Sequence, residues 1–245
     1  KQELVRKEVE LMLKEKKIRN SKSPYAAPVV LVAKPDGKIR FAVDYRKLNK
    51  NTKKDRFPIP RIDSLLEKMA GAKYYSTLDL KSAYHCVPIR EQDKEKTAFV
   101  TSDGLYEWNV MPFGLCNAPA TFQRLIQVVL KPFMYNGCLV YIDDILVYGH
   151  TWEAFLTNLE NVLRALYEAK LPLNMKKCFF GLTEVKFVGY IVNQFGVRMD
   201  PGKISAIQSF PKPLDKRSLQ RFLGMAGYFR KFIPEFAKIA APLYN

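Results

Sequence analysis

Tyr141-Ile142-Asp143-Asp144 separates two apolar runs of the sequence, Cys138-Leu139-Val140 and Ile145-Leu146-Val147-Tyr148. Runs rich in β-branched and aromatic residues are typical of strands, and a short polar break between two of them predicts a hairpin turn. Two adjacent carboxylates at the tip of a rigid hairpin suit hard divalent cations, because Mg²⁺ takes oxygen ligands and usually sits between carboxylates and phosphates. Polar turns between strands are common, however, so this stretch alone favours a turn that is merely solvated.

A third carboxylate, Asp79, lies near the end of another strand-like run, residues 74–80, which passes into Lys81-Ser82-Ala83-Tyr84. An acid at the end of one strand, beside a hairpin that carries two more, could form a cluster of three carboxylates. Such a cluster can hold two metal ions ~4 Å apart, which stabilise the attacking and leaving oxygens of a phosphoryl displacement. The three acids together therefore favour a metal-dependent site over a solvated turn.

The pattern of a strand with Asp79-x4-Tyr84, followed by Tyr141-x-Asp143-Asp144, closely resembles the palm of reverse transcriptases. Further blocks follow in the order of that family and extend the resemblance over essentially the whole chain. They are specific to the gypsy-type (Metaviridae) branch of LTR retrotransposons and correspond to a polymerase domain without ribonuclease H. These blocks are residues 23–32, 43–49, 57–62, 111–123, 187–190, 219–224 and 227–233.

The composition is strongly basic, with 40 Lys and Arg against 24 Asp and Glu and a net charge of +16. A basic globular protein commonly contacts phosphate, in nucleic acid or at a membrane surface. No apolar run approaches the ~20 residues of a membrane span, so we expect no membrane partner. Basic residues gather between positions 34 and 61 and between 212 and 238. These two patches could hold the phosphates of a duplex from two sides without reading its sequence.

Hydrophobic periodicity predicts a helix near the N-terminus, another over residues 152–166 and a third over 219–233. Residues 29–33 and 39–43 flank a Pro-Asp-Gly-Lys turn signal and predict a β-hairpin. The resemblance adds that this α+β fold is a right-hand polymerase of fingers, palm and thumb, with an antiparallel palm sheet backed by helices. The implied regions are fingers 1–57, palm 58–87, fingers 88–118, palm 119–194 and thumb 195–245.

The resemblance implies that Asp79, Asp143 and Asp144 are the metal-site residues and that the Leu80 carbonyl is a further ligand. The implied cofactors are two Mg²⁺ ions, with Mn²⁺ as a substitute. A primer 3′-hydroxyl would attack the α-phosphorus of a deoxynucleoside triphosphate and expel pyrophosphate, while the ions lower the pKa of the hydroxyl and steady the leaving oxygen. The three acids are therefore expected to be essential for synthesis but not for folding.

The resemblance also implies a pocket for the incoming nucleotide. Arg40 corresponds to the family's triphosphate-binding arginine, whose guanidinium fork suits phosphate, and Lys34 assists it. Tyr84 occupies the steric-gate position, where an aromatic ring leaves no room for a 2′-hydroxyl. Phe113 stands where many retroviral relatives carry a glutamine, so it can pack on the sugar but cannot donate a hydrogen bond. The backbone N–H groups expected to face the phosphates are those of Ser82 and Ala83.

Other positions are implied contacts for nucleic acid or for the leaving group. Val188, Gly189 and Tyr190 resemble the primer grip, where a glycine permits close approach of the backbone. Lys177 is the candidate general acid for pyrophosphate, with its neighbour Lys176 as the alternative. The remaining candidates for nucleic-acid contact are Arg46 on the template strand, Gly114, and Arg221 and Lys231 in the thumb.

The predicted function is primer-dependent DNA synthesis on RNA and DNA templates, in the cytoplasm and within virus-like particles. Expected partners are the template–primer duplex, dNTPs, a second copy in a homodimer, and the ribonuclease H and other domains of a polyprotein. Ribonuclease H activity itself is expected to be absent, because the acids beyond the primer grip are only Asp200, Asp215 and Glu235. The main alternative is a catalytically silent, nucleic-acid-binding scaffold subunit of a polymerase dimer. A third candidate, an RNA-synthesising polymerase, is disfavoured by Tyr84.

The four cysteines have no Cys-x-x-Cys spacing, which disfavours a zinc site.

Overall fold

Three β-sheets organise residues 2–33 and 39–244, the part of the chain that this computed structural model describes. A four-stranded sheet (β7-β8-β4-β9) lies between a five-stranded sheet (β1-β6-β5-β2-β3) and a three-stranded sheet (β10-β11-β12). The strands are β1 (Ile18–Asn20), β2 (Ala27–Ala33), β3 (Ile39–Val43), β4 (Tyr74–Asp79), β5 (Phe99–Thr101), β6 (Gly104–Trp108), β7 (Cys138–Tyr141), β8 (Asp144–Gly149), β9 (Phe179–Leu182), β10 (Glu184–Phe187), β11 (Tyr190–Asn193) and β12 (Gly196–Met199).

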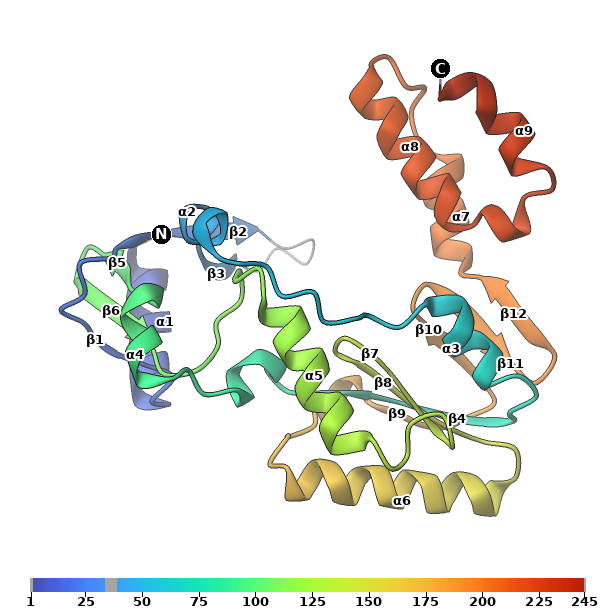
Figure 1. Cartoon of the computed structure of the whole chain (residues 1–245), viewed down its shortest axis with the longest axis horizontal. Coiled ribbons are helices and arrows are strands. Elements are labelled where there is room, and N and C mark those ends of the chain that lie inside the picture. The colour runs from blue at the N-terminus through green and yellow to red at the C-terminus, as the bar shows by residue number, and fades with distance from the viewer. Residues whose placement is uncertain (1, 34–38, 245) are drawn as a thin grey trace.

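The α-helices are α1 (Gln2–Lys14), α2 (Arg46–Asn51), α3 (Ile62–Lys68), α4 (Glu91–Lys94), α5 (Ala118–Leu130), α6 (Trp152–Glu168), α7 (Pro201–Gln208), α8 (Lys216–Tyr228) and α9 (Phe236–Ala240). α1, α2 and α4 lie with the five-stranded sheet, α5 and α6 with the four-stranded sheet, α3 beside the three-stranded sheet, and α7–α9 toward the C-terminus (Figure 1). The 3₁₀ turns are η1 (Ala83–Cys86), η2 (Glu95–Thr97), η3 (Met175–Lys177), η4 (Arg230–Phe232) and η5 (Ala241–Leu243). None of the described helices is long and apolar enough to cross a membrane.

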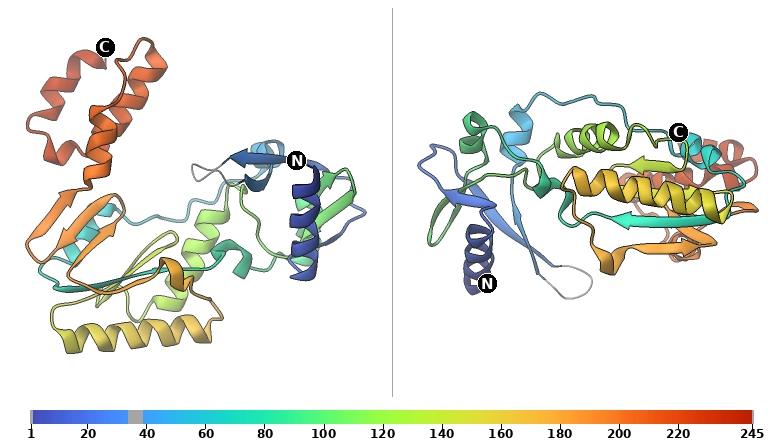
Figure 2. Two further views of the ribbon diagram at one scale, coloured as in Figure 1. Left: turned by 180° about the vertical axis from the view of Figure 1, so that it is seen from behind. Right: turned by 90° about the horizontal axis from the view of Figure 1, so that it is seen from below.

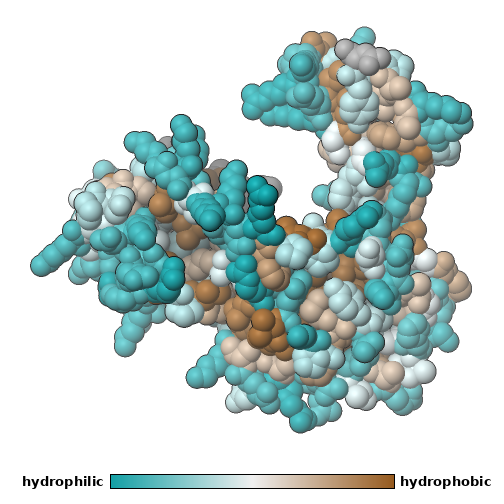
Figure 3. Space-filling view, viewed as in Figure 1, coloured by the Kyte–Doolittle hydropathy of each residue, from teal (hydrophilic) through white to brown (hydrophobic). Residues whose placement is uncertain are grey.

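The chain has the outline of a U, with the five-stranded sheet on one arm and α7–α9 on the other (Figure 1). The four-stranded sheet forms the base, and α6 runs along its outer side, away from the arms (Figure 2). The space-filling view has a hollow between the arms with mainly hydrophilic rims (Figure 3). The hollow opens toward the end of the four-stranded sheet that the helices leave uncovered.

The four-stranded sheet follows from the alternation of its apolar residues. In β8, Ile145 and Val147 face one side and Leu146 and Tyr148 the other, because successive strand side chains point to opposite faces. The predicted hairpin is present: β7 pairs antiparallel with β8, and Tyr141 lies opposite Asp144. Every β8 side chain except that of Asp144 is buried, so the register of this strand is strongly specified.

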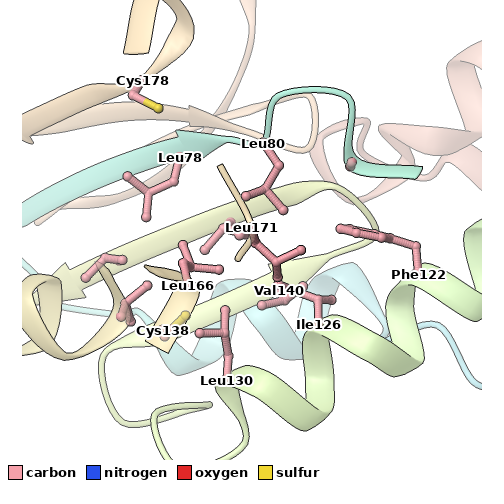
Figure 4. Packing of buried hydrophobic residues seen from close by; sticks show 14 of the residues in the cluster. Leu78, Leu80, Phe122, Ile126, Leu130, Cys138, Val140, Leu166, Leu171 and Cys178 are labelled. Atoms are coloured by element: carbon pink, nitrogen blue, oxygen red, sulfur yellow. The ribbon is translucent and has the colours of Figure 1, made fainter. Parts of the chain in front are cut away.

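One face of the sheet is covered by α5 and α6. Phe122, Ile126 and Leu130 of α5 point toward the strands, where they meet Val140 and Leu78 (Figure 4). All five side chains are at most 2% exposed, and fully burying a side chain of this kind contributes about 1.5–3 kcal/mol. The helix predicted over residues 152–166 is confirmed as α6 on this sheet. This cluster is the rigid backing of the strands that carry the carboxylates.

The other face is covered only in part, by the three-stranded sheet and α3. Tyr75 and Leu146 pack there against Val185, Phe187 and Tyr190, all of them buried. β10 alternates in the same way, since it reads exposed-buried-exposed-buried, whereas Tyr190, Ile191 and Val192 of the central strand β11 are all buried. The covering stops short of the far end of β4 and β8. This end, which carries Asp79 and Asp144, is therefore accessible to a ligand.

The N-terminal arm is built around the five-stranded sheet. The predicted hairpin of residues 29–33 and 39–43 is confirmed as β2 and β3, and its turn lies outside the described residues. Val9 and Met12 of the predicted N-terminal helix are buried on the same core as Phe99 and Trp108. β2 also pairs parallel with β5, a non-local connection.

The C-terminal arm contains α7–α9. The capping box between Asp215 and Ser218 fixes the start of α8, because each satisfies a backbone N–H of the other. The predicted helical stripe is confirmed up to Tyr228, where α8 ends, so that Ile233 lies beyond it. The predicted boundary at residues 194 and 195 falls inside the β11–β12 hairpin, and the region boundaries stay a prediction.

Candidate active site

Asp79 and Asp144 form the centre of the site. They are direct cross-strand partners at the open ends of β4 and β8, so their side chains lie on the same face. This face is the one that α5 and α6 leave free. Asp143 occupies the two-residue turn that joins β7 to β8, immediately before Asp144. The structure thus brings together the three acids that the sequence singled out.

The turn at Ile142 is held by a residue that sequence reasoning missed. Ile142 has φ +58°, which is a rare conformation for a β-branched residue. Gln123 of α5 is fully buried, and its Oε1 accepts a hydrogen bond of 2.5 Å from the Ile142 N–H. Its Nε2 is buried without a hydrogen-bond partner among the described residues. Gln123 stands at the end of the 111–123 block, which is the only sequence signal that could have marked it.

The charges at this end of the sheet repel one another. Partial desolvation, followed by the charges of Asp143 and Asp79, raises the pKa of the Asp144 carboxyl above its usual range. Lys177, in η3, offsets part of this charge, because its Nζ lies 3.6 Å from Asp79 Oδ2. Its side chain is exposed, and its role as a general acid stays a prediction.

The described residues contain no preformed cage of three or more His, Cys, Asp or Glu side chains around a single point. The donor chemistry nevertheless suits Mg²⁺, which is commonly held by one or two carboxylates while waters and substrate phosphates supply its other ligands. Leu80 follows Asp79 directly; its side chain is buried in the sheet core, and its backbone forms a bridge with Leu173. A metal site here would be completed by the substrate.

Tyr84, the second residue of η1, lies beside the carboxylates. Its ring packs against Phe113 at 5.0 Å and against Phe122 at 5.8 Å between centroids. Burial and the charge of Asp143 raise the pKa of the Tyr84 hydroxyl, so the ring adjoins the acidic end of the sheet. Phe113 remains 40% exposed and can contact a bound sugar. Tyr84 and Phe113 thus form an aromatic floor next to the three acids.

The chain enters η1 through Ser82, which has φ +53°. Ala83 is the first residue of this 3₁₀ turn, where the opening N–H groups have no acceptor within the helix itself. Of the other two predicted nucleotide contacts, Lys34 lies outside the described residues. Arg40 is described only by its backbone, which pairs with Val32 in the β2–β3 hairpin.

The β10–β11 hairpin approaches the carboxylates from the other side. A cavity of about 450 Å³ is lined by Asp79, Asp144, Lys177 and Val188, among others. Val188 and Gly189 form the two-residue turn of the hairpin, with φ +47° and +79°. A Cβ at Gly189 would lie 3.5 Å from the Tyr228 ring, so the positive φ, not lack of space, is what favours glycine there.

The remaining predicted contacts are spread over the arms. Arg46 has a side chain that is 90% exposed and forms a 2.6 Å ion pair with Asp44. Gly114, with φ +97°, accepts a hydrogen bond from the Asn49 side chain through its carbonyl. Arg221 is exposed on α8.

Lys231 has partners within the protein. Its Nζ lies 3.1 Å from Asp63 Oδ1 in α3 and 4.3 Å from the centre of the Tyr190 ring. The Lys231 charge therefore ties the C-terminal arm to the central body.

Residues 32–192 match the protein family described as reverse transcriptase (RNA-dependent DNA polymerase). The chain belongs to the reverse transcriptase family. Over 98% of its length it is 44% identical to the Pol polyprotein of the Drosophila melanogaster transposon opus and 38% identical to that of transposon gypsy. It is 37% identical over 97% of its length to the Tf2-3 polyprotein of Schizosaccharomyces pombe. The predicted membership in the gypsy-type retrotransposon branch is confirmed.

Solved structures of this family share the fold. The foamy viral protease–reverse transcriptase in complex with double-stranded DNA matches 95% of this chain and 41% of its own, with a TM-score of 0.88 at 32% identity. The complex with an RNA/DNA hybrid matches 99% of this chain and 33% of its own, with a TM-score of 0.86 at 30% identity. The predicted α+β polymerase fold is therefore confirmed. The chain spans 18–24% of the length of these transposon polyproteins.

Proposed function

We propose that this reverse transcriptase chain catalyses primer-dependent DNA synthesis on RNA and DNA templates. The observation that carries the proposal is the register of β4 and β8, which places Asp79 opposite Asp144 with Asp143 in the adjoining turn. Phosphoryl transfer needs little covalent participation by the protein and depends on positioning and on neutralising charge. A carboxylate cluster at the open end of a buried, rigid sheet would supply the positioning, and the divalent cations that it would hold would neutralise the charge.

Asp79, Asp143 and Asp144, with the Leu80 carbonyl, would hold two Mg²⁺ ions, for which Mn²⁺ is a substitute. When bound, the ions lower the pKa of the primer hydroxyl and neutralise charge on the phosphates. Partial burial, and after it the like charges of Asp143 and Asp79, raise the pKa of Asp144, which supports this assignment because a divalent cation would relieve the repulsion. Lys177 donates a proton to the leaving pyrophosphate, with Lys176 in the same turn as the alternative donor.

The incoming dNTP is placed over the aromatic floor. Tyr84 excludes a 2′-hydroxyl, and Phe113 packs on the sugar, since its exposed ring lies 5.0 Å from that of Tyr84. The triphosphate contacts assigned by the resemblance are Lys34, Arg40 and the backbone N–H groups of Ser82 and Ala83. The N–H groups that open η1 have no acceptor within the helix itself, which supports a role for Ser82 and Ala83 in binding phosphate oxygens.

The template–primer duplex occupies the hollow between the arms. Two structures of foamy viral protease–reverse transcriptase contain double-stranded DNA or an RNA/DNA hybrid, which supports a duplex as the ligand of this chain. The net charge of +16 suits phosphate contacts that do not depend on sequence. The contacts that the resemblance assigns are Arg46, Gly114, Val188, Gly189, Tyr190, Arg221 and Lys231, of which Lys231 is engaged by its ion pair with Asp63. The same proposal includes action within a longer polyprotein and in virus-like particles.

Primer extension tests this function. A labelled DNA primer on an RNA template is incubated with dNTPs and with Mg²⁺ or EDTA, using the wild type, Asp143→Asn and the remote control Glu168→Gln. Extension by the wild type and the control, but not by Asp143→Asn or in EDTA, is expected. Duplex binding by all three proteins with no extension by any would instead favour the scaffold subunit of a polymerase dimer.

A further inference from the structure

The turn between β10 and β11 has an unfavourable residue at its tip. Phe187 pairs with Tyr190, so Val188 and Gly189 form a two-residue loop with positive φ at both positions. This is the pattern of a type I′ turn, for which Asn-Gly is strongly preferred. A β-branched residue with positive φ is an outlier that persists only where its surroundings hold it. The Val188 conformation therefore requires a contact from outside the hairpin.

That contact comes from the end of α8. The Tyr228 hydroxyl donates a 2.6 Å hydrogen bond to the Val188 carbonyl. The Tyr228 ring stacks on the Tyr190 ring, with centroids 5.5 Å apart and planes 23° apart. The Tyr190 hydroxyl in turn donates to the Tyr228 carbonyl over 3.2 Å. Tyr190 of the hairpin and Tyr228 of the helix thus each donate a hydrogen bond to the backbone of the other element.

These contacts lie where α8 of the C-terminal arm meets the β10–β11 hairpin. Tyr228 is the last residue of α8 and is 41% exposed, whereas its neighbour Phe229 is 3% exposed and anchors the chain in the core. Val188 lines the same cavity as Asp79 and Asp144. The Tyr228 hydroxyl therefore reaches from the helical arm to a turn that adjoins the carboxylates, without being needed to fill the core.

We propose that Tyr228 is a positioning residue, whose hydroxyl holds the Val188-Gly189 turn and so links the orientation of α8 to the placement of the primer end. The inference rests on the proposed function for its effect on synthesis. Its effect on the turn is independent of that function. Tyr228 does not touch the reacting atoms; it acts through the Val188 backbone.

Tyr228→Phe tests the inference, because it deletes the hydroxyl and keeps the stacked ring. Amide hydrogen exchange of the β10–β11 hairpin in the free protein is expected to accelerate at least fivefold, with an unchanged Tm. In single-turnover extension of a pre-bound primer, the rate is expected to fall at least fivefold while the duplex Kd changes less than twofold. Tyr244→Phe, an exposed tyrosine in the same arm, is the matched control.

The Val188→Asn background provides a second readout. The substitution introduces the side chain that this turn prefers, so the hydroxyl should become less important. We expect the effect of Tyr228→Phe on hairpin exchange to shrink to less than twofold in this background. An equal effect in both backgrounds, or hairpin exchange at the wild-type rate in Tyr228→Phe, overturns the inference. If the wild type does not extend primers but Tyr228→Phe still accelerates hairpin exchange, only the proposed function and the link to synthesis are overturned. The role of the hydroxyl in holding the turn then stands.

Discussion

Asp79 and Asp144 face each other across the last pair of the β4–β8 ladder, where partial burial and then the charges of Asp143 and Asp79 disfavour the ionised form of Asp144. The pKa of Asp144 is raised above its ordinary value of 3.8, so the folded chain holds this proton more tightly than the unfolded chain. Stability contributed by Asp144 is therefore greatest at low pH. It falls as the pH rises from 3.8 through the raised pKa, and the cost persists at neutral pH.

Asp144→Asn should consequently raise the Tm at neutral pH in the absence of divalent cations, and this gain should vanish near pH 3. Mg²⁺ should raise the Tm of the wild type by binding the folded state, but not that of the variant. Primer extension by the variant should fall about 100-fold or more. Thermal melts with Mg²⁺ or EDTA measure the effect, with Glu168→Gln as control. A Mg²⁺ response that survives in Asp144→Asn contradicts the metal assignment.

Gln123→Met should weaken both the fold and synthesis. The variant keeps the length of the side chain but removes the oxygen that accepts from the Ile142 N–H. Leaving this partly buried donor without a partner costs about 1–3 kcal/mol, which removal of the unpartnered Gln123 Nε2 offsets in part. The chevron or urea midpoint gives the stability change, and single-turnover extension gives the rate. Added to Gln123→Met, Ile142→Gly removes the strain of a β-branched residue with positive φ and should restore part of the extension rate. Wild-type synthesis by Gln123→Met alone would show that the hydrogen bond is dispensable.

Tyr84→Ala should raise the use of ribonucleotides relative to deoxyribonucleotides by about tenfold or more, equivalent to ~1.4 kcal/mol. The reason is that the ring lies on Phe113 and Phe122 and is held in place beside the carboxylates. The ratio of kcat/KM for rNTP and dNTP is the measurement. Tyr84→Phe retains the ring and should keep the wild-type ratio. Identical selectivity in Tyr84→Ala and the wild type rejects the gate.

Gly149→Ala should destabilise the fold without touching the site. A Cβ at Gly149 would lie 2.6 Å from backbone atoms of Phe155, where α6 starts against β8. Overpacking of this kind costs about 1–3 kcal/mol and should lower the Tm by several degrees. Gly224→Ala is the matched control, because nothing lies within 4 Å of its Cβ and alanine favours the helix. A Tm equal to that of the wild type in Gly149→Ala would contradict the close packing of α6.

Lys231→Gln distinguishes two roles of this lysine. As a phosphate contact, predicted from the sequence, Lys231 would contribute about one unit to the slope of log Kd against log salt concentration. As the partner of Asp63, it contributes at most about 1 kcal/mol to stability and nothing to that slope. The ion pair leads us to expect an unchanged slope and a Tm loss shared with Asp63→Asn. A slope reduced by one unit would return Lys231 to the nucleic acid.

The sequence was sufficient for the parts of the site that depend on local alternation. The β7–β8 hairpin follows from apolar periodicity, whereas the position of Asp79 beside that hairpin is an expectation supplied by the resemblance to reverse transcriptases. Gln123 could not be predicted, since its role depends on how α5 packs against a turn nineteen residues later. The positive φ of Ile142 and Val188 runs against the preference of β-branched residues and is imposed by tertiary contacts. The pairing of Lys231 with Asp63 spans 168 residues and leaves no local pattern.

The strand orders also set the sequence in which the chain can fold as it is synthesised. The five-stranded sheet is complete once β6 has been made, at Trp108. β4 must wait longer, because its two neighbours, β8 and β9, end at Gly149 and Leu182. Until then the strand that carries Asp79 exposes unpaired edges, which are templates for aggregation. Nascent chains halted between these two points should therefore hold a folded N-terminal arm beside a β4 edge that is vulnerable to mispairing and to capture by chaperones.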